Sequence, residues 1–397
     1  MAAQQSLDAD DLAETLARIE RAVNLGAAGE ELCAMRVIES QARYFRGEYV
    51  EAERAARKAL VSGDARTRLG ALSALFDGLG PQAKYDEVAS LFRELERPAA
   101  PELLNPWLHC VVNATAYLAV GGDKDVRERT LALLEESKER LEPTIVGRAE
   151  SLKAQIARSK GNPAEVMAGD KRAIEHYESI GNRRAACESL GNLGVSLLEV
   201  GQLEEAETDM RQILATAQKL GLNLILGGAL QGLTNILAYQ GSFEEARATG
   251  ERAVAVTSAQ NDRRFQGYAE AYLSVTEYLA GDYSRAEHYA RAAVTTWEPV
   301  FSVRPFAIAL LARALLAQGC RAEALVSARD AYAQLESLGV VDDGEATIRL
   351  ALAECLIAVG DTLAAREVLA KAAGRILASA EAIEDPAIRE SFLTRIP

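Results

Sequence analysis

Three histidines are the side chains of this 397-residue sequence best suited to bind a metal ion or act as a general base. His109, His176 and His288 lie in different parts of the chain. A metal centre or a catalytic triad needs several such groups held together in space. The sequence has no HExxH, GxSxG, GxxxxGKS or GxxxxGKT motif and no Gly-rich dinucleotide turn. We therefore expect no metal, no cofactor and no catalytic residue.

Neighbouring glutamates are a second arrangement that could do acid–base chemistry. Glu204–Glu205 and Glu244–Glu245 are two such pairs, and each follows a Gly at the same offset. That offset places both pairs at the predicted start of a helix, where carboxylates are stabilised by the helix dipole. Recurrence at a helix start indicates capping and solvation, so we expect that the protein is not an enzyme.

Composition and charge indicate which classes of partner to exclude and in which cell compartment the protein is expected. The sequence has 44 basic and 58 acidic residues, a net charge of −14, and no basic stripe to match a phosphate backbone. Its five cysteines are scattered without a CxxC pair, which favours small buried helix residues in a reducing cytosol. No apolar run reaches the roughly 18–20 residues that span a bilayer. We expect a cytoplasmic protein that binds neither nucleic acid nor membrane. The cysteines are Cys33, Cys110, Cys187, Cys320 and Cys355.

The elements that would position binding side chains follow from an internal repeat. Four segments share a Gly, a large residue two positions later and an Ala five positions later: 47–52, 201–206, 241–246 and 281–286. Turn glycines recur at intervals of 40 residues from Gly161 to Gly281, and Gly319 and Gly360 follow at 38 and 41. A repeat of this length is typical of a solenoid built from helix hairpins.

Each repeat has two turns and therefore two helices. The first Gly ends one helix, because Gly adopts the left-handed conformation of a C-cap with little strain. A second Gly, at 181, 221 and 339, ends the next helix, and Asn261 occupies the equivalent position in another repeat. No extended alternation of apolar and polar residues interrupts the pattern, so we expect no sheet. The predicted fold is all-α: a right-handed superhelical solenoid of about nine hairpins, each a helix A followed by a helix B.

The segment LGNLGVSLLEVGQLEEA (190–206) resembles the tetratricopeptide repeat (TPR), with Leu, Gly and Ala at the offsets of that family. The resemblance runs from about residue 30 to 375, but the period is near 40 where the common unit has about 34 residues. Repeats of this greater length resemble the TPR arrays of MalT-like and STAND regulators and of kinase-associated bacterial proteins. The pattern is degenerate over 76–106, where three prolines fall in a predicted linker: Pro98, Pro101 and Pro106.

These patterns predict three parts of the chain. The sequence predicts N-terminal repeats over 1–97, the main solenoid over 107–380, and a C-terminal capping helix within 381–397. Its first helix, at about 8–24, is expected to be an incomplete repeat or a cap.

The resemblance implies that the A helices line a concave groove that binds the ligand. Counting back from each turn Gly gives a candidate set, to which Glu188 and Glu199 are neighbours. Asn192 sits where related TPR proteins use an Asn to bind the backbone amides of a ligand; alternatively it bonds a neighbouring helix. Tyr268, Tyr272 and Tyr278, with Trp297, form either an aromatic anchor pocket or ordinary core packing. The predicted ligand-binding residues are Arg148, Gln155, Arg158, Asn192, Gln231, Asn235, Tyr239, Tyr268, Tyr272, Tyr278 and Arg313.

Two functions fit such a groove. The first is a non-catalytic scaffold that binds a peptide or protein partner in bacterial signalling or regulation. The alternative is a sensor domain for a small effector, as in MalT-like transcriptional regulators and STAND ATPases. No ATPase, kinase or DNA-binding motif is present in these residues to decide between the two.

Overall fold

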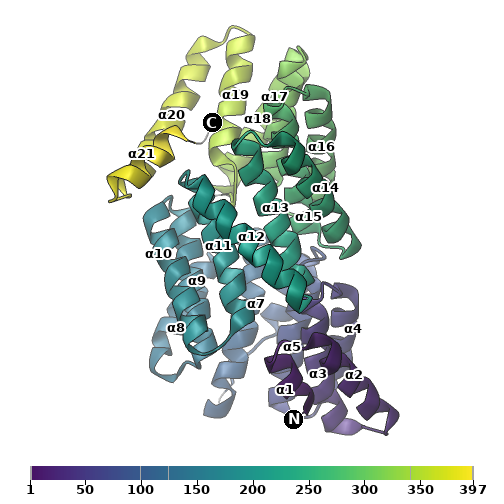
Figure 1. Cartoon of the computed structure of the whole chain (residues 1–397). Coiled ribbons are helices and arrows are strands. Elements are labelled where there is room, and N and C mark those ends of the chain that lie inside the picture. Colours follow the sequence, from purple (N-terminus) through teal and green to yellow (C-terminus); the bar gives the residue numbers. More distant parts are fainter. Residues whose placement is uncertain (1, 99, 124, 340, 396–397) are drawn as a thin grey trace.

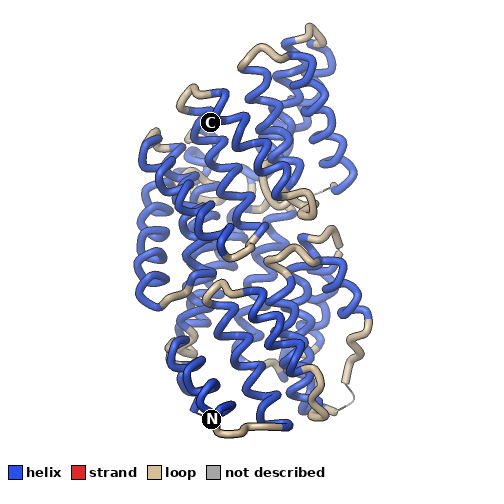
Figure 2. The backbone as a smooth tube through the Cα atoms, turned by 90° about the vertical axis from the view of Figure 1, so that its right-hand side faces the viewer, coloured by secondary structure: helices blue, strands red, loops and turns tan. Residues whose placement is uncertain are grey.

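The computed structural model describes residues 2–98, 100–123, 125–339 and 341–395, and in these ranges it contains helices, turns and loops but no strand (Figure 2). The chain begins with α1 (Ala2–Asp8) and α2 (Leu12–Asn24), and nine helix hairpins follow in the described ranges. We call the first helix of each hairpin helix A and the second helix B. A final short helix, α21 (Pro386–Thr394), completes the described chain.

The first five hairpins are α3 (Gly29–Phe45) with α4 (Tyr49–Ala59), α5 (Ala65–Leu79) with α6 (Tyr85–Arg93), α7 (Leu104–Val120) with α8 (Val126–Glu136), α9 (Pro143–Ser159) with α10 (Pro163–Ser179), and α11 (Arg183–Glu199) with α12 (Leu203–Leu220). The other four are α13 (Asn223–Tyr239) with α14 (Phe243–Ala259), α15 (Arg263–Leu279) with α16 (Tyr283–Thr296), α17 (Arg304–Ala317) with α18 (Arg321–Leu338), and α19 (Glu345–Ala358) with α20 (Thr362–Glu381). Two single 3-10 turns, η1 (Pro101–Leu103) and η2 (Lys138–Arg140), lie in the connections before α7 and α9.

The turns fall where the glycine pattern predicts them. Gly201 has φ 78° and Gly241 has φ 79°, so both adopt the left-handed conformation that ends a helix A. Asn261 has φ 58° where other repeats have a Gly, which confirms it as the equivalent turn residue. After several of these turns an Asp or Asn side chain accepts a hydrogen bond from a backbone N–H of the next helix. The cap of α15 by Asp262 is one example.

Small residues allow the two helices of a hairpin to pack closely. The repeated alanines at 52, 206, 246 and 286 are completely buried, as their close-packing role requires. The large residue three positions earlier is buried at Tyr49 and Leu203 but is 37% exposed at Tyr283, whose ring lies against Tyr278. The large residue is therefore not a buried wedge between helices in every repeat, since the ring of Tyr283 lies on the last turn of α15.

The solenoid winds so that repeats far apart in sequence touch. Tyr49 Oη donates a hydrogen bond to Asp262 Oδ2 at 3.1 Å, and Arg263 N donates to Pro81 O at 3.0 Å. At the other end, Arg395 of α21 pairs with Glu204 at the start of α12. The N-terminal hairpins thus lie beside α13 and α15, and α21 folds back toward α10 and α12 (Figure 1). The predicted all-α superhelical solenoid of about nine hairpins is confirmed.

The N-terminus differs from the prediction. The helix expected at about 8–24 is α2, which begins only at Leu12 and is preceded by a further helix, α1. Asp10 adopts φ 62° between the two, and Asp11 then caps α2 by accepting a hydrogen bond from Glu14 N. Four of the five cysteines are buried as expected, but Cys320 is exposed at the N-cap of α18. Among the described residues, no helix is both long and apolar enough for a membrane span. The boundaries at 97, 107 and 380 stay predictions.

Candidate functional site

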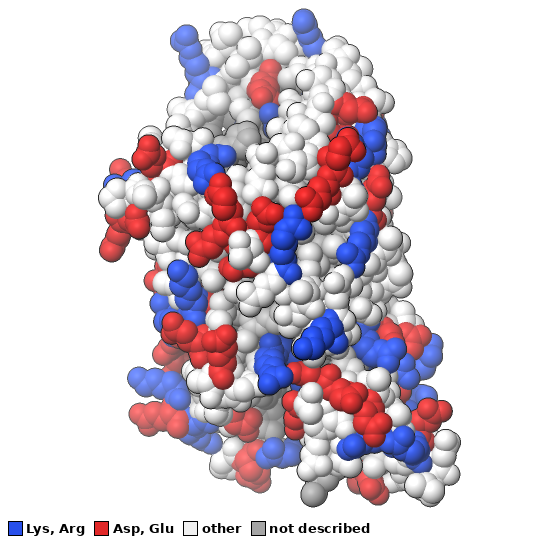
Figure 3. All heavy atoms as spheres, viewed as in Figure 1, with Lys and Arg blue, Asp and Glu red and all other residues white. Residues whose placement is uncertain are grey.

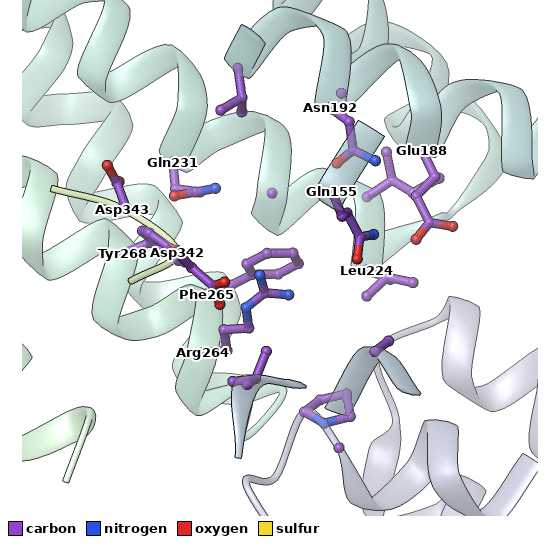
Figure 4. A pocket seen from close by; sticks show the side chains of 18 of the residues that line it. Gln155, Glu188, Asn192, Leu224, Gln231, Arg264, Phe265, Tyr268, Asp342 and Asp343 are labelled. Carbon is purple, nitrogen blue, oxygen red and sulfur yellow. The ribbon is translucent and has the colours of Figure 1, made fainter. Parts of the chain in front are cut away.

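A cavity of about 320 Å³ lies on the helix-A side of the solenoid. Its walls come from A helices between α3 and α15, and from the loop residues 341–343 that precede α19. Contacts between successive turns of the superhelix, such as Tyr49 with Asp262, close part of the groove around it. In Figure 4, Gln155, Glu188 and Asn192 lie on one side of the cavity, and Tyr268 and Asp343 lie on the other.

The structure gathers most of the predicted binding residues at this cavity. Seven of the eleven candidates line it, and so do the neighbouring Glu188 and Glu199. They come from four A helices, α9, α11, α13 and α15, whose turn glycines fixed the register of the prediction. The seven are Arg148, Gln155, Arg158, Asn192, Gln231, Tyr268 and Tyr272.

The other four candidates are absent from the cavity lining. Asn235 is buried, and its Oδ1 has no hydrogen-bond partner among the described residues. Tyr239 packs partly buried against the apolar core. Arg313 pairs with Glu354 at 3.0 Å, and its guanidinium lies 4.6 Å from the ring centroid of Tyr278. Asn235, Tyr239 and Tyr278 lie nearer the C-terminal ends of α13 and α15 than the residues of those two helices that line the cavity. No residue of α17, the helix of Arg313, is part of the lining.

Three amide side chains face the cavity without a hydrogen bond to the rest of the described chain. Asn192 is exposed, and its side chain makes no such bond, which argues against the alternative that it only ties two helices together. Gln155 lies on the neighbouring helix α9 and is likewise available. Gln231 is 7% exposed, and its Oε1 is buried without a partner. Amides offer both a donor and an acceptor, the complement of a peptide group.

The aromatic residues divide between cavity and core. Tyr268 and Tyr272 line the cavity with ring centroids 5.7 Å apart. Trp297 is completely buried, packs edge-on against Tyr268 at 4.9 Å, and donates from Nε1 to Arg264 O at 3.0 Å. Trp297 is therefore a core residue that supports the tyrosines, and Tyr278 lies away from them beside Arg313. Of the four aromatic residues expected in an anchor pocket, only Tyr268 and Tyr272 line the cavity.

The arginines that line the cavity differ in whether a carboxylate pairs with them. Arg158 of α9 pairs with Glu199 and donates to Ser196 Oγ of α11 at 2.9 Å. Among the described residues, no carboxylate lies within ion-pair distance of Arg148 or Arg264. Burial disfavours the charge of Arg148, but the carboxylates of Glu188 and Asp77 outweigh it and raise its pKa. Arg148 and Arg264 are thus charged and available to a ligand.

Several acidic residues of the cavity were not predicted from the sequence. Asp77 accepts a hydrogen bond from Asn113 Nδ2 at 2.9 Å, and burial raises its pKa to about 7. Asp342 and Asp343 lie in the loop before α19. From the sequence, an Asp pair ahead of a helix indicates N-terminal capping and not a ligand site. Asp77 lies where the repeat pattern becomes degenerate. Neither position carried a sequence signal for a ligand site.

The face of the molecule drawn in Figure 3 carries no large patch of one charge. On the face shown in Figure 3, basic and acidic side chains are interspersed. Many of them form ion pairs between successive hairpins, such as Arg211 with Glu245 and Arg291 with Glu323. Within the described ranges, no group of three or more His, Cys, Asp or Glu side chains could hold a metal ion. The cavity is therefore the strongest candidate for a binding site.

Comparisons with known proteins agree with the repeat. The family model described as "Tetratricopeptide repeat" matches residues 187–220, which cover α11 and α12. No curated protein matches the sequence. The solved structure of a Rap protein complexed with Competence and Sporulation Factor is similar over 91% of this chain and 95% of its own, with a TM-score of 0.57 and 16% identity. A STAND protein with a tetratricopeptide repeat sensor, from Pyrococcus horikoshii, has a TM-score of 0.48 and 14% identity; the match covers 89% of this chain and 55% of that one.

Proposed function

We propose that this tetratricopeptide-repeat protein is a non-catalytic scaffold that binds a short peptide, or a peptide segment of a protein partner, in the cavity on its concave helix-A side. We further propose that it acts in the cytoplasm, in bacterial signalling or regulation. The observation that carries the proposal is the set of three available amides on the successive A helices α9, α11 and α13: Gln155, Asn192 and Gln231.

The chemistry of these amides suits a peptide. An extended peptide presents N–H and C=O groups at regular intervals, and each amide side chain can donate to one and accept from another. The helix register places Gln155, Asn192 and Gln231 on neighbouring walls, so one ligand can contact more than one of them. Arg148 and Arg264 add charged donors for a carboxylate or a carbonyl.

The Rap structure supports this proposal as a fold analogue. Its title names Competence and Sporulation Factor as the bound molecule, and its chain is covered almost completely by the match. Because identity is only 16%, the likeness concerns the fold, and function is argued from the side chains of this chain.

The size of the cavity favours a second candidate, a small effector. Its volume of about 320 Å³ lies near the lower end of the roughly 300–1,000 Å³ found for small-molecule pockets. Such a ligand would sit between Tyr268 and Tyr272 on one side and Asn192 on the other. In that case the protein would be the sensor part of a regulator.

A library of short random peptides tests the proposal. We expect the immobilised protein to select peptides that bind in calorimetry, and Gln155→Ala with Asn192→Ala to weaken them about 5- to 150-fold per lost hydrogen bond. Glu205→Ala, an exposed change on helix B, is the matched control and should leave affinity unchanged. Selection of no peptide, or equal loss with the Glu205 control, would count against the peptide scaffold. A small-molecule hit that loses affinity in the double variant would favour the effector sensor.

A further inference from the structure

The loop before α19 brings one carboxylate to the cavity wall in a fixed position. Asp342 is held by Arg127 Nη2 at 3.2 Å and by Ser302 Oγ at 2.8 Å. Its backbone N also donates to Ser302 O at 3.1 Å. The next residue, Asp343, accepts a hydrogen bond from Tyr272 Oη at 2.8 Å and lines the cavity. The two neighbouring aspartates therefore have different partners.

The two aspartates differ in that only Asp342 has a cationic partner among the described residues. Arg127 forms an ion pair with Asp342, and the pKa of Asp342 is lowered despite its burial. No cation of the described residues lies within ion-pair distance of Asp343. Burial raises the pKa of Asp343 to about 6. The Arg158 guanidinium, which favours the charged form of Asp343, is already paired with Glu199.

Neutral acceptors and aromatic rings complete the surroundings of Asp343. Gln231, which is more than nine-tenths buried, lines the same cavity with an Oε1 that has no partner. In the view of Figure 4, Gln231, Asp343 and Tyr268 lie on the same side of the cavity, opposite Asn192. The tyrosines at 268 and 272 add ring surface. A carboxylate, an unpaired acceptor and aromatic rings are together the partners that a guanidinium or ammonium group requires.

We propose that Asp343, Gln231 and the rings of Tyr268 and Tyr272 form a subsite for a cationic group of the ligand, a guanidinium or ammonium. This rests on the proposed function, because it names the chemistry of one part of the ligand in the same cavity. The cation pairs with the Asp343 carboxylate, donates a second hydrogen bond to Gln231 Oε1, and leaves Tyr272 Oη bonded to Asp343. It supplies the ion-pair partner that Asp342 has in Arg127 and Asp343 lacks.

Calorimetry with N-acetyl-arginine amide as the probe tests the subsite. We expect N-acetyl-citrulline amide, which has the same shape without the charge, to bind at least about fivefold more weakly. Asp343→Asn keeps an acceptor for Tyr272 and should weaken the arginine probe about tenfold, and Gln231→Leu should also weaken it. Glu205→Gln, which removes a carboxylate from an exposed position on helix B outside the cavity, is the control and should alter affinity by less than about twofold.

The pH dependence of binding to the parent protein gives a second readout, and Asp343→Asn identifies its source. Lowering the pH from about 8 to about 5 protonates most Asp343 side chains and should weaken the arginine probe about tenfold. Tyr239, Tyr268, Tyr272, Arg158 and Glu199 also face this carboxylate, so the dependence should disappear in Asp343→Asn if Asp343 is its source.

Three results would overturn the subsite: equal affinity for the citrulline probe, unchanged affinity in folded Asp343→Asn, or an equal loss in Glu205→Gln. The peptide library separates this failure from failure of the scaffold. If the selected peptides need Gln155 and Asn192 for binding but are not enriched in Arg or Lys, the scaffold proposal stands and the subsite proposal is wrong. If binding of the arginine probe depends on Asp343 but the library yields no peptide, the subsite proposal stands and the peptide-scaffold proposal is wrong.

Discussion

Asp77 belongs to a group of four aspartates whose carboxyl groups line the cavity. Burial raises the pKa of Asp77 to about 7 and those of Asp170, Asp262 and Asp343 to about 6. Each accepts hydrogen bonds from neighbouring groups, but none has an ion-pair partner among the described residues. The interior of the solenoid therefore contains acidic groups that change charge between weakly acidic and neutral pH.

A substitution at Asp77 tests this effect on stability. Its folded-state pKa lies above the unfolded value of 3.8, so the stability it contributes is fully present below about pH 4 and is lost as pH rises through about 7. Asp77→Asn removes the buried charge and still accepts from Asn113. We expect it to raise the free energy of unfolding by about 1–3 kcal/mol at about pH 8 and by little at about pH 4.

Chemical denaturation of both proteins across this pH range measures the difference. Comparison with the parent matters because burial lowers the pKa of His109, which has the opposite pH dependence. Glu205→Gln on the exposed face is the control and should give a pH-independent difference near zero. A gain for Asp77→Asn that is the same at both ends of the range would contradict the assignment.

At the scale of the hairpin, the left-handed turn is the element on which the repeat depends. Gly201 and Gly241 have nearly equal φ, but their surroundings differ. A Cβ at Gly241 would meet no atom within 4 Å, whereas one at Gly201 would lie 2.7 Å from Ser391 Oγ of α21. The same sequence motif thus serves only as a turn in one repeat and as a turn plus a docking point for α21 in another.

Valine at each turn separates the two effects. Gly241→Val should lower the free energy of unfolding by about 1–2 kcal/mol through backbone strain alone. Gly201→Val should lower it further, because the new side chain also displaces α21. Gly191→Ala, inside α11 with open space around it, is the control and should be neutral or stabilising by up to about 1 kcal/mol. Equal losses at both turns in urea denaturation would show that α21 does not rest on Gly201.

At the scale of the whole molecule, contacts between successive superhelical turns close the groove into a cavity. The Arg127–Asp342 pair joins α8 to the loop before α19, and both side chains are mostly buried. Tyr49 with Asp262 and Arg395 with Glu204 join other pairs of distant repeats. In a solenoid whose repeats otherwise contact only their neighbours, such contacts fix the curvature.

Arg127→Met tests whether this pair holds the turns together. Loss of one partner leaves the Asp342 carboxylate largely buried with Ser302 as its remaining hydrogen-bond partner, so we expect a loss of about 1–3 kcal/mol. Small-angle X-ray scattering should show a larger radius of gyration. Lys160→Met breaks the exposed pair with Glu128 and should change stability by less than about 0.5 kcal/mol. An unchanged radius with unchanged stability would mean that neighbour packing alone sets the curvature.

The local elements of this protein follow from the sequence by itself. The 40-residue glycine interval placed the turns, and Asn261 was correctly identified as a turn residue because Asn also tolerates a left-handed conformation. Counting from those turns placed Gln155, Asn192 and Gln231 on the helix-A side, since residues three and four apart share a helix face. These inferences succeeded because their causes lie within about one repeat of chain.

The enclosure of the site was decided by the tertiary structure alone. Asp343 contacts Tyr272 because the loop before α19 is held by Arg127, which lies more than half the chain away in sequence. Such contacts depend on the pitch of the superhelix, which sums small rotations over many repeats and leaves no local pattern of residue types. For the same reason the sequence did not show that Tyr278 lies outside the cavity although α15 lines it, or that α17, which carries Arg313, does not reach the cavity.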